Sequence, residues 1–304
     1  MHVLAQASCL TVTTPAKLNL FLEVLAKRND GFHEIETLMV PVNLYDTLYF
    51  RDEPQGPVTL QCEFSVDPAD DAARCLPAAP ENLVVRAVEL LRQESGCERG
   101  ARMRLIKRIP IAAGLAGGSS DAAAALVAAN LGWRLGYSRE QLAWFASQLG
   151  SDIPFFLAAQ PAVCRGRGER IEPLPQLAPL HFVIVRPSAG LSTADVYRAC
   201  RPAEHPASVT TIQTAAEKGR LRELGRLLHN QLQPAARQLS PWIGRLEDEF
   251  ARLDVVGHLM SGSGTSYFGL CRGARHARFV AGRLRARRVG RVFVVRACRQ
   301  ETAN

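Results

Sequence analysis

The sequence has 304 residues, of which 47% are hydrophobic and 22% are charged, a composition typical of a globular protein large enough for two domains. No stretch approaches the roughly 18 apolar residues of a membrane-spanning helix, the first residues do not resemble a signal peptide, and the eight cysteines are scattered without a CxxC pair. These features argue against a membrane partner, a structural zinc site and a disulfide framework, and predict a cytoplasmic protein with reduced thiols. The net charge of +8 suits an anionic partner, which could be a nucleotide, another phosphate compound or a nucleic acid.

The first predicted element is a strand over residues 11–24. Its residues alternate between an aliphatic face and a second face that carries Lys17 and Asn19, so the aliphatic face should lie against the core. The second face is either a solvated surface, as in most strands, or a place where a lysine and an asparagine are presented together.

A turn and further strands follow. The Asn-Asp-Gly sequence at residues 29–31 predicts a turn, and Phe32 and His33 come directly after it. These two side chains could stack on a nucleobase or simply fix the turn. Residues 34–44 resume an extended pattern, and residues 58–64 form a short strand at most.

A helix and a strand then lead into a glycine-rich loop. Apolar residues at helical spacing predict a helix over residues 81–92, which Gly96 ends. Residues 101–109 read as a strand, and it delivers the chain to the loop from Pro110 to Ser120.

The glycine-rich loop is the strongest candidate for a binding site. Gly114, Gly117 and Gly118 are free to adopt positive φ and to let a ligand approach the backbone. Ser119 is a suitable N-cap for the alanine-rich helix that should begin at about Ser120. A loop that enters a helix N-terminus favours phosphate binding, although a tight turn before a buried helix is the alternative. Neither a Walker GxxxxGK sequence nor a Rossmann GxGxxG sequence occurs in the chain.

The next signals mark a helix and a carboxylate. Residues 138–141 form a capping box for a helix that ends at Gly150. Asp152 comes directly afterwards, as either a structural turn residue or a carboxylate held beside an active site. Residues 165–169 predict a hairpin turn, and the prolines that follow indicate a domain boundary nearby.

The second half predicts further strands and helices. Residues 181–185 read as a buried strand, and Ser192 caps a helix that carries Tyr197. The remaining predicted elements are helices around residues 221–232, 241–253 and 275–288 and strands at residues 258–261, 267–270 and 292–297. This alternation predicts an α+β fold in both halves, with domains at residues 1–160 and 161–304.

Three motifs now stand in order along the chain: Pro15-Ala-Lys-Leu-Asn-Leu20, the loop from Pro110 to Ser120, and Ser261-Gly-Ser-Gly264. In this order they resemble the GHMP kinases. Asp30-Gly-Phe-His33 and Gly150-Ser-Asp-Ile-Pro-Phe155 resemble the branch whose substrate is a cytidine-diphosphate-linked methylerythritol. The resemblance covers nearly the whole chain. It implies the two-domain GHMP kinase fold, with a ribosomal protein S5 domain 2-like N-terminal ATP-binding domain and a ferredoxin-like α+β C-terminal substrate domain.

The resemblance also implies a reaction. The chain would use ATP to phosphorylate the 2-hydroxyl of 4-diphosphocytidyl-2-C-methyl-D-erythritol, a step of the non-mevalonate isoprenoid precursor pathway. Asp152 matches the family's catalytic aspartate, which either accepts the hydroxyl proton or only orients the hydroxyl. Lys17 matches the partner lysine, whose charge would favour the forming alkoxide and screen the transferring phosphoryl group.

The resemblance implies the binding residues as well. His33 would pair with the cytosine, Phe32 and Tyr197 would stack on it, and Asn19 would contact the substrate; Phe32 stands where the family more often has tyrosine. Mg²⁺ would be held mainly by phosphates, water and a loop serine, since no carboxylate is an evident protein ligand. We expect a monomer or weak homodimer that binds no nucleic acid. The nucleotide contacts implied are Pro110, Ile111, Ala112, Ala113, Gly114, Leu115, Ala116, Gly117, Gly118, Ser119, Ser120 and Asn82, and the remaining substrate contacts are Gly262, Ser263 and Gly264.

One departure and three alternatives remain. Ala112, Ala113 and Ala116 replace glycines found in some relatives, so Ala116 should have a conformation that tolerates a Cβ. Another GHMP kinase acting on homoserine or mevalonate is possible, although those substrates carry no base for an aromatic pocket. A catalytically dead regulator is also possible. The arginines between residues 272 and 291 could bind nucleic acid, but a solvated helix face explains them more simply.

Overall fold

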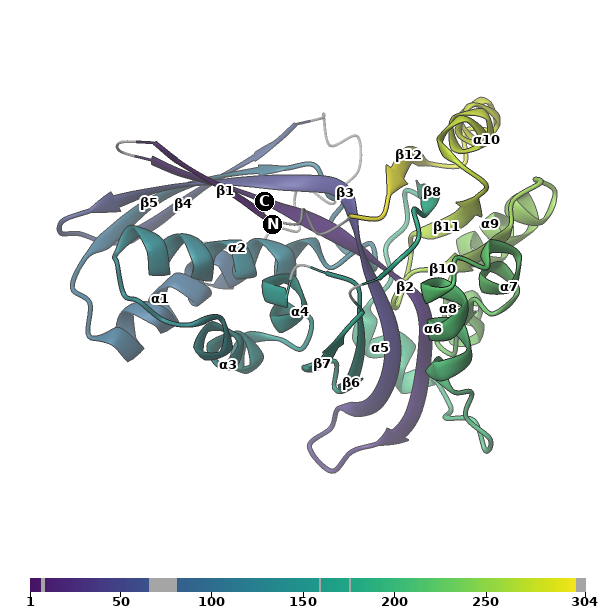
Figure 1. Ribbon diagram of the computed structural model, residues 1–304, viewed down its shortest axis with the longest axis horizontal. Helices are drawn as coiled ribbons and strands as arrows, with labels where there is room; N and C mark the ends of the chain where they lie inside the picture. The colour runs from purple at the N-terminus through teal and green to yellow at the C-terminus, as the bar shows by residue number, and fades with distance from the viewer. Residues whose placement is uncertain (7–8, 66–80, 159, 175, 299–304) are drawn as a thin grey trace. The chain divides into compact units, whose positions relative to one another are not determined.

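The computed structural model describes residues 1–6, 9–65, 81–158, 160–174 and 176–298. The chain forms two compact units, both drawn in Figure 1. Unit 1 comprises residues 1–16, 44–111 and 116–159, and unit 2 comprises residues 17–43, 112–115 and 160–304. Each unit therefore contains several separate stretches of chain. The predicted domains 1–160 and 161–304 are continuous stretches, and that division stays a prediction.

Unit 1 combines strands with helices that cover them on one side, as Figure 1 shows. Helix α1 packs against α2, and α2 packs against α4. The elements are, in chain order, β1 (His2–Gln6), the first part of β2 (Cys9–Lys27), the second part of β3 (His33–Glu53), β4 (Val58–Phe64), α1 (Leu83–Ser95), β5 (Gly100–Lys107), α2 (Gly117–Gly132), α3 (Arg139–Leu149) and α4 (Ile153–Ala158).

Unit 2 contains the remaining parts of β2 and β3 and most of the second half of the chain. Its other elements are β6 (Ala162–Gly166), β7 (Arg170–Pro173), β8 (His181–Arg186), α5 (Thr193–Ala199), α6 (Val209–Glu217), α7 (Leu221–Arg226), β9 (His229–Asn230), α8 (Gln233–Leu239), α9 (Pro241–Ala251), β10 (Gly257–Met260), β11 (Tyr267–Cys271), α10 (Ala274–Ala286) and β12 (Arg291–Arg296).

The strands of the described residues belong to two sheets. The larger has the order β1-β2-β3-β5-β4, with β6 paired to β3, β7 to β6 and β9 to β2. The smaller has the order β10-β11-β8-β12 and is antiparallel throughout. Strands β2 and β3 are 19 and 21 residues long, and each contributes to both units. Lys17 lies where β2 passes from unit 1 into unit 2.

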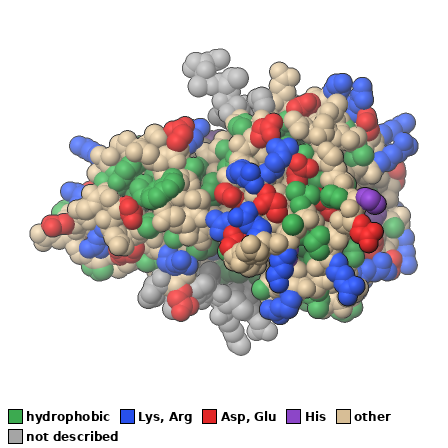
Figure 2. Space-filling view, turned by 90° about the horizontal axis from the view of Figure 1, so that it is seen from below, with side chains coloured by type: hydrophobic (Ala, Val, Ile, Leu, Met, Phe, Trp, Pro, Cys, Tyr) green, Lys and Arg blue, Asp and Glu red, His purple; other side chains and the backbone are tan. Residues whose placement is uncertain are grey.

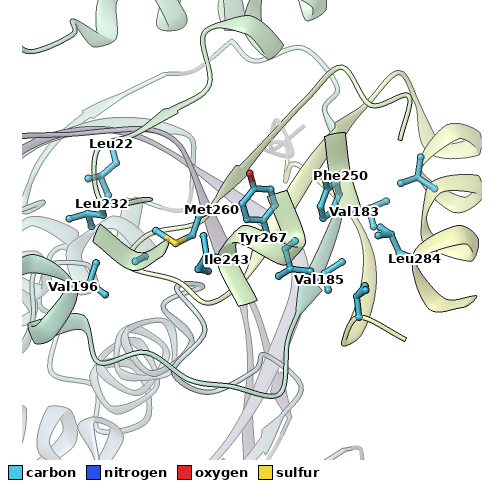
Figure 3. Packing of buried hydrophobic residues seen from close by; sticks show 14 of the residues in the cluster. Leu22, Val183, Val185, Val196, Leu232, Ile243, Phe250, Met260, Tyr267 and Leu284 are labelled. Carbon is cyan, nitrogen blue, oxygen red and sulfur yellow. The ribbon is translucent and has the colours of Figure 1, made fainter. Parts of the chain in front are cut away.

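The core of unit 2 is built on the smaller sheet. Val183 and Val185 of β8 point to one face, two residues apart as strand geometry requires. Phe250 of α9 and Leu284 of α10 pack in the same buried cluster, as Figure 3 shows. Tyr267 of β11 is fully buried within it. This core supports the turn that follows β10, which is part of the candidate site.

Most predicted elements are confirmed, with ends that differ by a few residues, and the α+β class is confirmed. Residues 153–158 form α4, which was not predicted; Pro154 is compatible with it, because a proline in the first helical turn costs no hydrogen bond. The helix predicted over residues 221–232 ends at Arg226. Residues 229–230 instead form β9, since they pair in parallel with β2. Helices α6 and α8 were not predicted.

Candidate functional site

The motif that contains Lys17, the Ser261–Gly264 motif and the middle of the glycine-rich loop meet within unit 2. The Leu115 carbonyl accepts a hydrogen bond from the Lys17 backbone N–H at 3.2 Å. The Gly114 carbonyl accepts one from the Ser261 hydroxyl at 3.0 Å. Gly114 has a φ of +71°, and a Cβ at this position would lie 2.0 Å from the Ser261 carbonyl oxygen. Only glycine therefore fits, because the loop backbone packs directly on the turn after β10.

Lys17 is the charged group at this meeting point. Its side chain is buried, and its Nζ donates to Asn19 Oδ1 at 2.5 Å. Asn19 Nδ2 in turn donates to Thr37 Oγ1 at 2.8 Å. Lys17, Asn19 and Thr37 are 4%, 2% and 1% exposed. The interpretation of this strand face as a solvated surface is therefore wrong. The alternative, that it presents Lys17 and Asn19 together, is confirmed.

Both glycines of the turn after β10 have a positive φ. Gly262 and Gly264 have φ values of +57° and +91°, and the Gly264 N–H donates to the Ser261 carbonyl at 3.0 Å. A Cβ at Gly262 would lie 3.2 Å from Lys17 Nζ. The turn therefore borders the Lys17 ammonium closely, and a side chain at residue 262 would encroach on it.

Two residues that the sequence did not indicate hold this turn. Asn230 of β9 is buried, and its Nδ2 donates to the carbonyls of Met260 and Gly262, each at 2.8 Å. The hydroxyls of Ser263 and Thr193 are 2.8 Å apart. Thr193 begins α5, so the turn is linked to the helix that carries Tyr197. An isolated asparagine in a two-residue strand gives no sequence signal for such a role.

Aromatic residues gather at the start of β3. The rings of His33 and Tyr197 are 5.1 Å apart between centroids. Phe32 is 49% exposed, and the Arg167 guanidinium lies over its ring at 4.8 Å. Burial, and secondarily the charge of Lys27, lower the pKa of His33 below its usual 6.5. The imidazole is therefore neutral at pH 7 and can donate one hydrogen bond and accept another.

The helix α2 begins earlier than predicted. Its N-cap is Ala116, with a φ of +54° and no side-chain cap. The assignment of Ser119 as N-cap is therefore wrong, and Ser119 lies in the first turn. Ala116 and Ala112 both have left-handed backbone conformations, which cost roughly 1–2 kcal/mol for a residue with a Cβ. The Cβ of Ala116 is accommodated at this cost, because the small left-handed region is open to residues with a Cβ.

Two of the three loop glycines, Gly117 and Gly118, do not have positive φ. Gly117 begins α2, and a Cβ there would lie 2.9 Å from the Ile109 side chain. Its lack of a side chain leaves room for Ile109, the second residue after β5, against the start of α2. A Cβ at Gly118 would meet only ordinary contact with Leu83, at 3.9 Å. Positive φ is confirmed for Gly114 alone among the three. The first N–H groups of α2 have no partners within the helix, as at any helix N-terminus.

A buried ion cluster lies beneath this end of α2 within unit 1. Lys107, at the end of β5, contacts the carboxylates of Asp46 and Asp121, the latter at 2.5 Å. All three side chains are at most 3% exposed. Burial lowers the pKa of Lys107, but the adjacent Asp121 and Asp46 carboxylates outweigh it and raise the pKa overall. Burial raises the pKa of Asp121, although Lys107 opposes this.

Two residues implied as nucleotide contacts make hydrogen bonds inside the protein. The Ser120 hydroxyl donates to the Pro15 carbonyl at 2.6 Å and lies 2.6 Å from the Thr14 hydroxyl. Asn82 caps α1, with its Oδ1 accepting from the Val84 N–H at 3.0 Å. Ser119 is half-buried and therefore more accessible than Ser120. That any of these residues contacts the nucleotide stays a prediction.

Asp152 lies in unit 1, between two helices. The capping box of α3 is confirmed, and the helix ends at Gly150 as predicted. The Ile153 N–H then donates to the Gly150 carbonyl at 3.3 Å, so Asp152 sits in a tight turn before α4 and is half-buried. Its partnership with Lys17, which belongs to unit 2, stays a prediction.

The described residues contain neither an evident metal site nor a membrane-spanning helix. In this part of the chain, no three His, Cys, Asp or Glu side chains gather in a way that could hold a metal ion. None of its helices combines the length and apolar character needed to cross a membrane.

Comparison with known proteins assigns the chain to a family. The family descriptions "GHMP kinases N terminal domain" and "GHMP kinases C terminal" match residues 82–160 and 212–289. The chain is 44% identical over 278 residues to the 4-diphosphocytidyl-2-C-methyl-D-erythritol kinase of Pelotomaculum thermopropionicum, which covers 91% of this chain and 94% of that protein. A crystal structure of a 4-(cytidine 5'-diphospho)-2C-methyl-D-erythritol kinase has a TM-score of 0.74 and 36% identity, covering 95% of this chain and 99% of its own.

A more distant structure shares the fold alone. The homoserine kinase of Cytophaga hutchinsonii has a TM-score of 0.73 at 19% identity, covering 98% of this chain and 97% of its own. The two-domain fold implied by the motifs is therefore confirmed, and the chain belongs to the GHMP kinase family.

Proposed function

We propose that this protein transfers the γ-phosphoryl group of ATP to the 2-hydroxyl of 4-diphosphocytidyl-2-C-methyl-D-erythritol. The reaction is the one implied by the relatives that match over most of the chain. The structural observation that carries it is the meeting of Lys17, the loop backbone at Gly114 and the Ser261–Gly264 turn within unit 2. A buried ammonium beside two glycine-containing backbone segments is suited to stabilise a transferring phosphoryl group.

The proposed chemistry needs two charged groups. The 2-hydroxyl oxygen attacks the γ-phosphorus, a new P–O bond forms, and the bond to the ADP oxygen breaks. Asp152 accepts the hydroxyl proton or orients the hydroxyl during attack. Lys17 favours the negative charge that develops on the attacking oxygen and on the phosphoryl oxygens. Its burial strengthens this attraction, because water screens it little.

The cytidine end of the substrate is assigned to the aromatic group at β3. A neutral His33 can match the donor and acceptor edge of cytosine, and Phe32 and Tyr197 offer ring faces for stacking. This group distinguishes the proposed substrate from homoserine and mevalonate, which have no base. Asn19 contacts the substrate close to Lys17 in this proposal, and the Gly262–Gly264 turn lies against its diphosphate.

MgATP binds at the glycine-rich loop in this proposal. The N-terminus of α2 supplies backbone N–H groups and a favourable dipole for the phosphates. The Ser120 hydroxyl is committed to the Pro15 carbonyl, so Ser119 is the loop hydroxyl better suited to approach the magnesium ion or a phosphate oxygen. In this proposal the ion is carried mainly by phosphates and water, the usual habit of Mg²⁺.

ADP release in the presence of MgATP tests the proposal. The acceptors are 4-diphosphocytidyl-2-C-methyl-D-erythritol, mevalonate, homoserine and none. Wild type should turn over only the cytidine compound, and Asp152→Asn should lose about 10²–10⁴-fold in kcat if the carboxylate acts as a base. Asp254→Asn is a matched control, because Asp254 is exposed and pairs only at the surface with Arg272 among the described contacts; it should retain full activity.

Each other result has a distinct meaning. Turnover of another acceptor keeps the family and rejects the substrate. Unchanged turnover in Asp152→Asn removes this carboxylate from the mechanism. Binding of ATP without turnover of any acceptor favours a catalytically inactive regulator.

A further inference from the structure

We propose that Thr37 is a positioning residue that fixes the orientation of the Asn19 amide and thereby holds the Lys17 ammonium. The inference rests on the proposed function, because it concerns the lysine assigned to phosphoryl transfer. Thr37 lies in β3, whereas Lys17 and Asn19 lie in β2. Neither the sequence motifs nor the implied binding residues include it.

The direction of each hydrogen bond follows from the chemistry of the groups. Thr37 Oγ1 lies 2.5 Å from the Phe21 carbonyl oxygen, which can only accept. A hydroxyl has one hydrogen, so that hydrogen is committed to Phe21. Towards Asn19, at 2.8 Å, the Thr37 oxygen can therefore only accept.

This requirement fixes the amide of Asn19. Its NH₂ group must face Thr37, and its Oδ1 must face the other way, where Lys17 Nζ lies at 2.5 Å. An ammonium can only donate, so the carbonyl oxygen is the group that it needs. The order of donation runs from Lys17 to Asn19, from Asn19 to Thr37, and from Thr37 to the Phe21 backbone.

Because these side chains are buried, the loss of any one of these hydrogen bonds matters. The three side chains are at most 4% exposed, so water cannot readily replace a lost partner. Without the Thr37 hydroxyl, the amide loses the group that sets its orientation. The flipped amide would place its NH₂ against the ammonium, where two donors face each other. Lys17 would then leave the place where it acts on the transferring phosphoryl group.

Three substitutions on β3 separate this role from a general effect on folding. Thr37→Val keeps the shape and removes the hydroxyl, and Thr37→Ser keeps the hydroxyl. Thr47→Val is the matched control: Thr47 is also a buried threonine of β3, and its hydroxyl accepts from Arg108 at 3.0 Å. Steady-state kcat and KM for both substrates are measured with urea unfolding of each variant.

Thr37→Val should lower kcat about tenfold or more, on the scale that misplacement of a catalytic group brings. KM for ATP should stay within about twofold of wild type, as expected for an interaction that matters in the transition state. Thr37→Ser should restore kcat, and Thr47→Val should keep it. In an Asn19→Leu background, Thr37→Val should add little further loss, because the two residues act through one chain of bonds. Should Thr37→Val not fold, Thr37→Cys, which hydrogen-bonds weakly, should give an intermediate kcat.

An unchanged kcat in Thr37→Val, or in Thr37→Cys where the valine variant does not fold, overturns the role of Thr37. Equal losses in Thr37→Val, Thr37→Ser and Thr47→Val overturn it as well, since they indicate a general effect of altering β3. Absence of wild-type turnover with the cytidine substrate rejects the proposed function instead, so the two failures are distinguishable.

Discussion

The protonation state of His33 should control binding of the cytidine substrate. Burial, with the charge of Lys27, lowers its pKa below 6.5, so the ring stays neutral through pH 7 and takes up a proton only in more acidic solution. The neutral ring offers one donor and one acceptor to cytosine, whereas the protonated ring offers two donors. We therefore expect KM for the cytidine substrate to be constant between about pH 7 and 8.5 and to rise as the pH falls through the lowered pKa.

His33→Gln provides the control for this prediction. A glutamine amide keeps one kind of donor and one acceptor but does not titrate in this range. KM of this variant should be higher than that of wild type at pH 7.5 and independent of pH in the acidic range. An acidic rise that persists in His33→Gln, or a wild-type rise whose midpoint lies above pH 6.5, would contradict the assignment of the titration to His33.

At the scale of elements, the buried Lys107 joins β5 to the first turns of α2. Lys107→Met leaves the buried carboxylates of Asp46 and Asp121 without their cation. Loss of one partner of a buried ion pair costs about 3–5 kcal/mol. Urea unfolding at pH 7 should therefore show a decrease of this size in the free energy of unfolding, with an unchanged m-value.

The same strand supplies a matched control. Arg104 of β5 pairs with Glu63 at 2.6 Å, but their side chains are 51% and 35% exposed. Arg104→Met should cost at most about 1 kcal/mol, as is usual for exposed pairs. Equal effects of the two substitutions would mean that burial of the Lys107 cluster contributes nothing special to stability.

The sequence could foresee what local signals determine. The capping box at Ser138, the end of α3 at Gly150 and the strand over residues 11–24 each depend on neighbouring residues, and each is confirmed. Lys107 and Asp46 are 61 positions apart, and Thr37 is 18 positions from Asn19. Such pairings depend on the register between strands, which no local pattern specifies, and so the charge cluster and the positioning of Lys17 became apparent only in the structure.

At the scale of the whole molecule, basic and acidic side chains are mixed on the surface drawn in Figure 2. On the face drawn in Figure 2, lysine and arginine side chains are interspersed with aspartate and glutamate. Within the arginine-rich segment near α10, Arg272 pairs with Asp254 and Arg287 pairs with Glu249, each at 2.7 Å. Arginines that are partly neutralised by neighbouring acids favour the interpretation of this segment as a solvated surface over a continuous track for nucleic acid.

The way in which the chain is divided predicts how the whole molecule unfolds. Proteins with independent domains often show several transitions, but here neither unit is a continuous stretch of chain. Unit 1 needs residues 1–16, 44–111 and 116–159, and residues 17–43 and 112–115 between them belong to unit 2. Strands β2 and β3 also run through both units, so unfolding of one unit removes the anchored ends of strands in the other. Differential scanning calorimetry should therefore show one cooperative transition, with equal calorimetric and van't Hoff enthalpies.

Lys107→Met makes this expectation specific, because Lys107, Asp46 and Asp121 all lie in unit 1. If the units unfold together, the substitution should move the entire transition to lower temperature and leave it single. A loss of about 3–5 kcal/mol should shift Tm by several degrees or more, since about 1 kcal/mol already corresponds to roughly 2–4 °C in domains of 150–250 residues. Two separate transitions in the variant, with only one displaced from its wild-type temperature, would show that unit 2 holds its fold when unit 1 has lost its own.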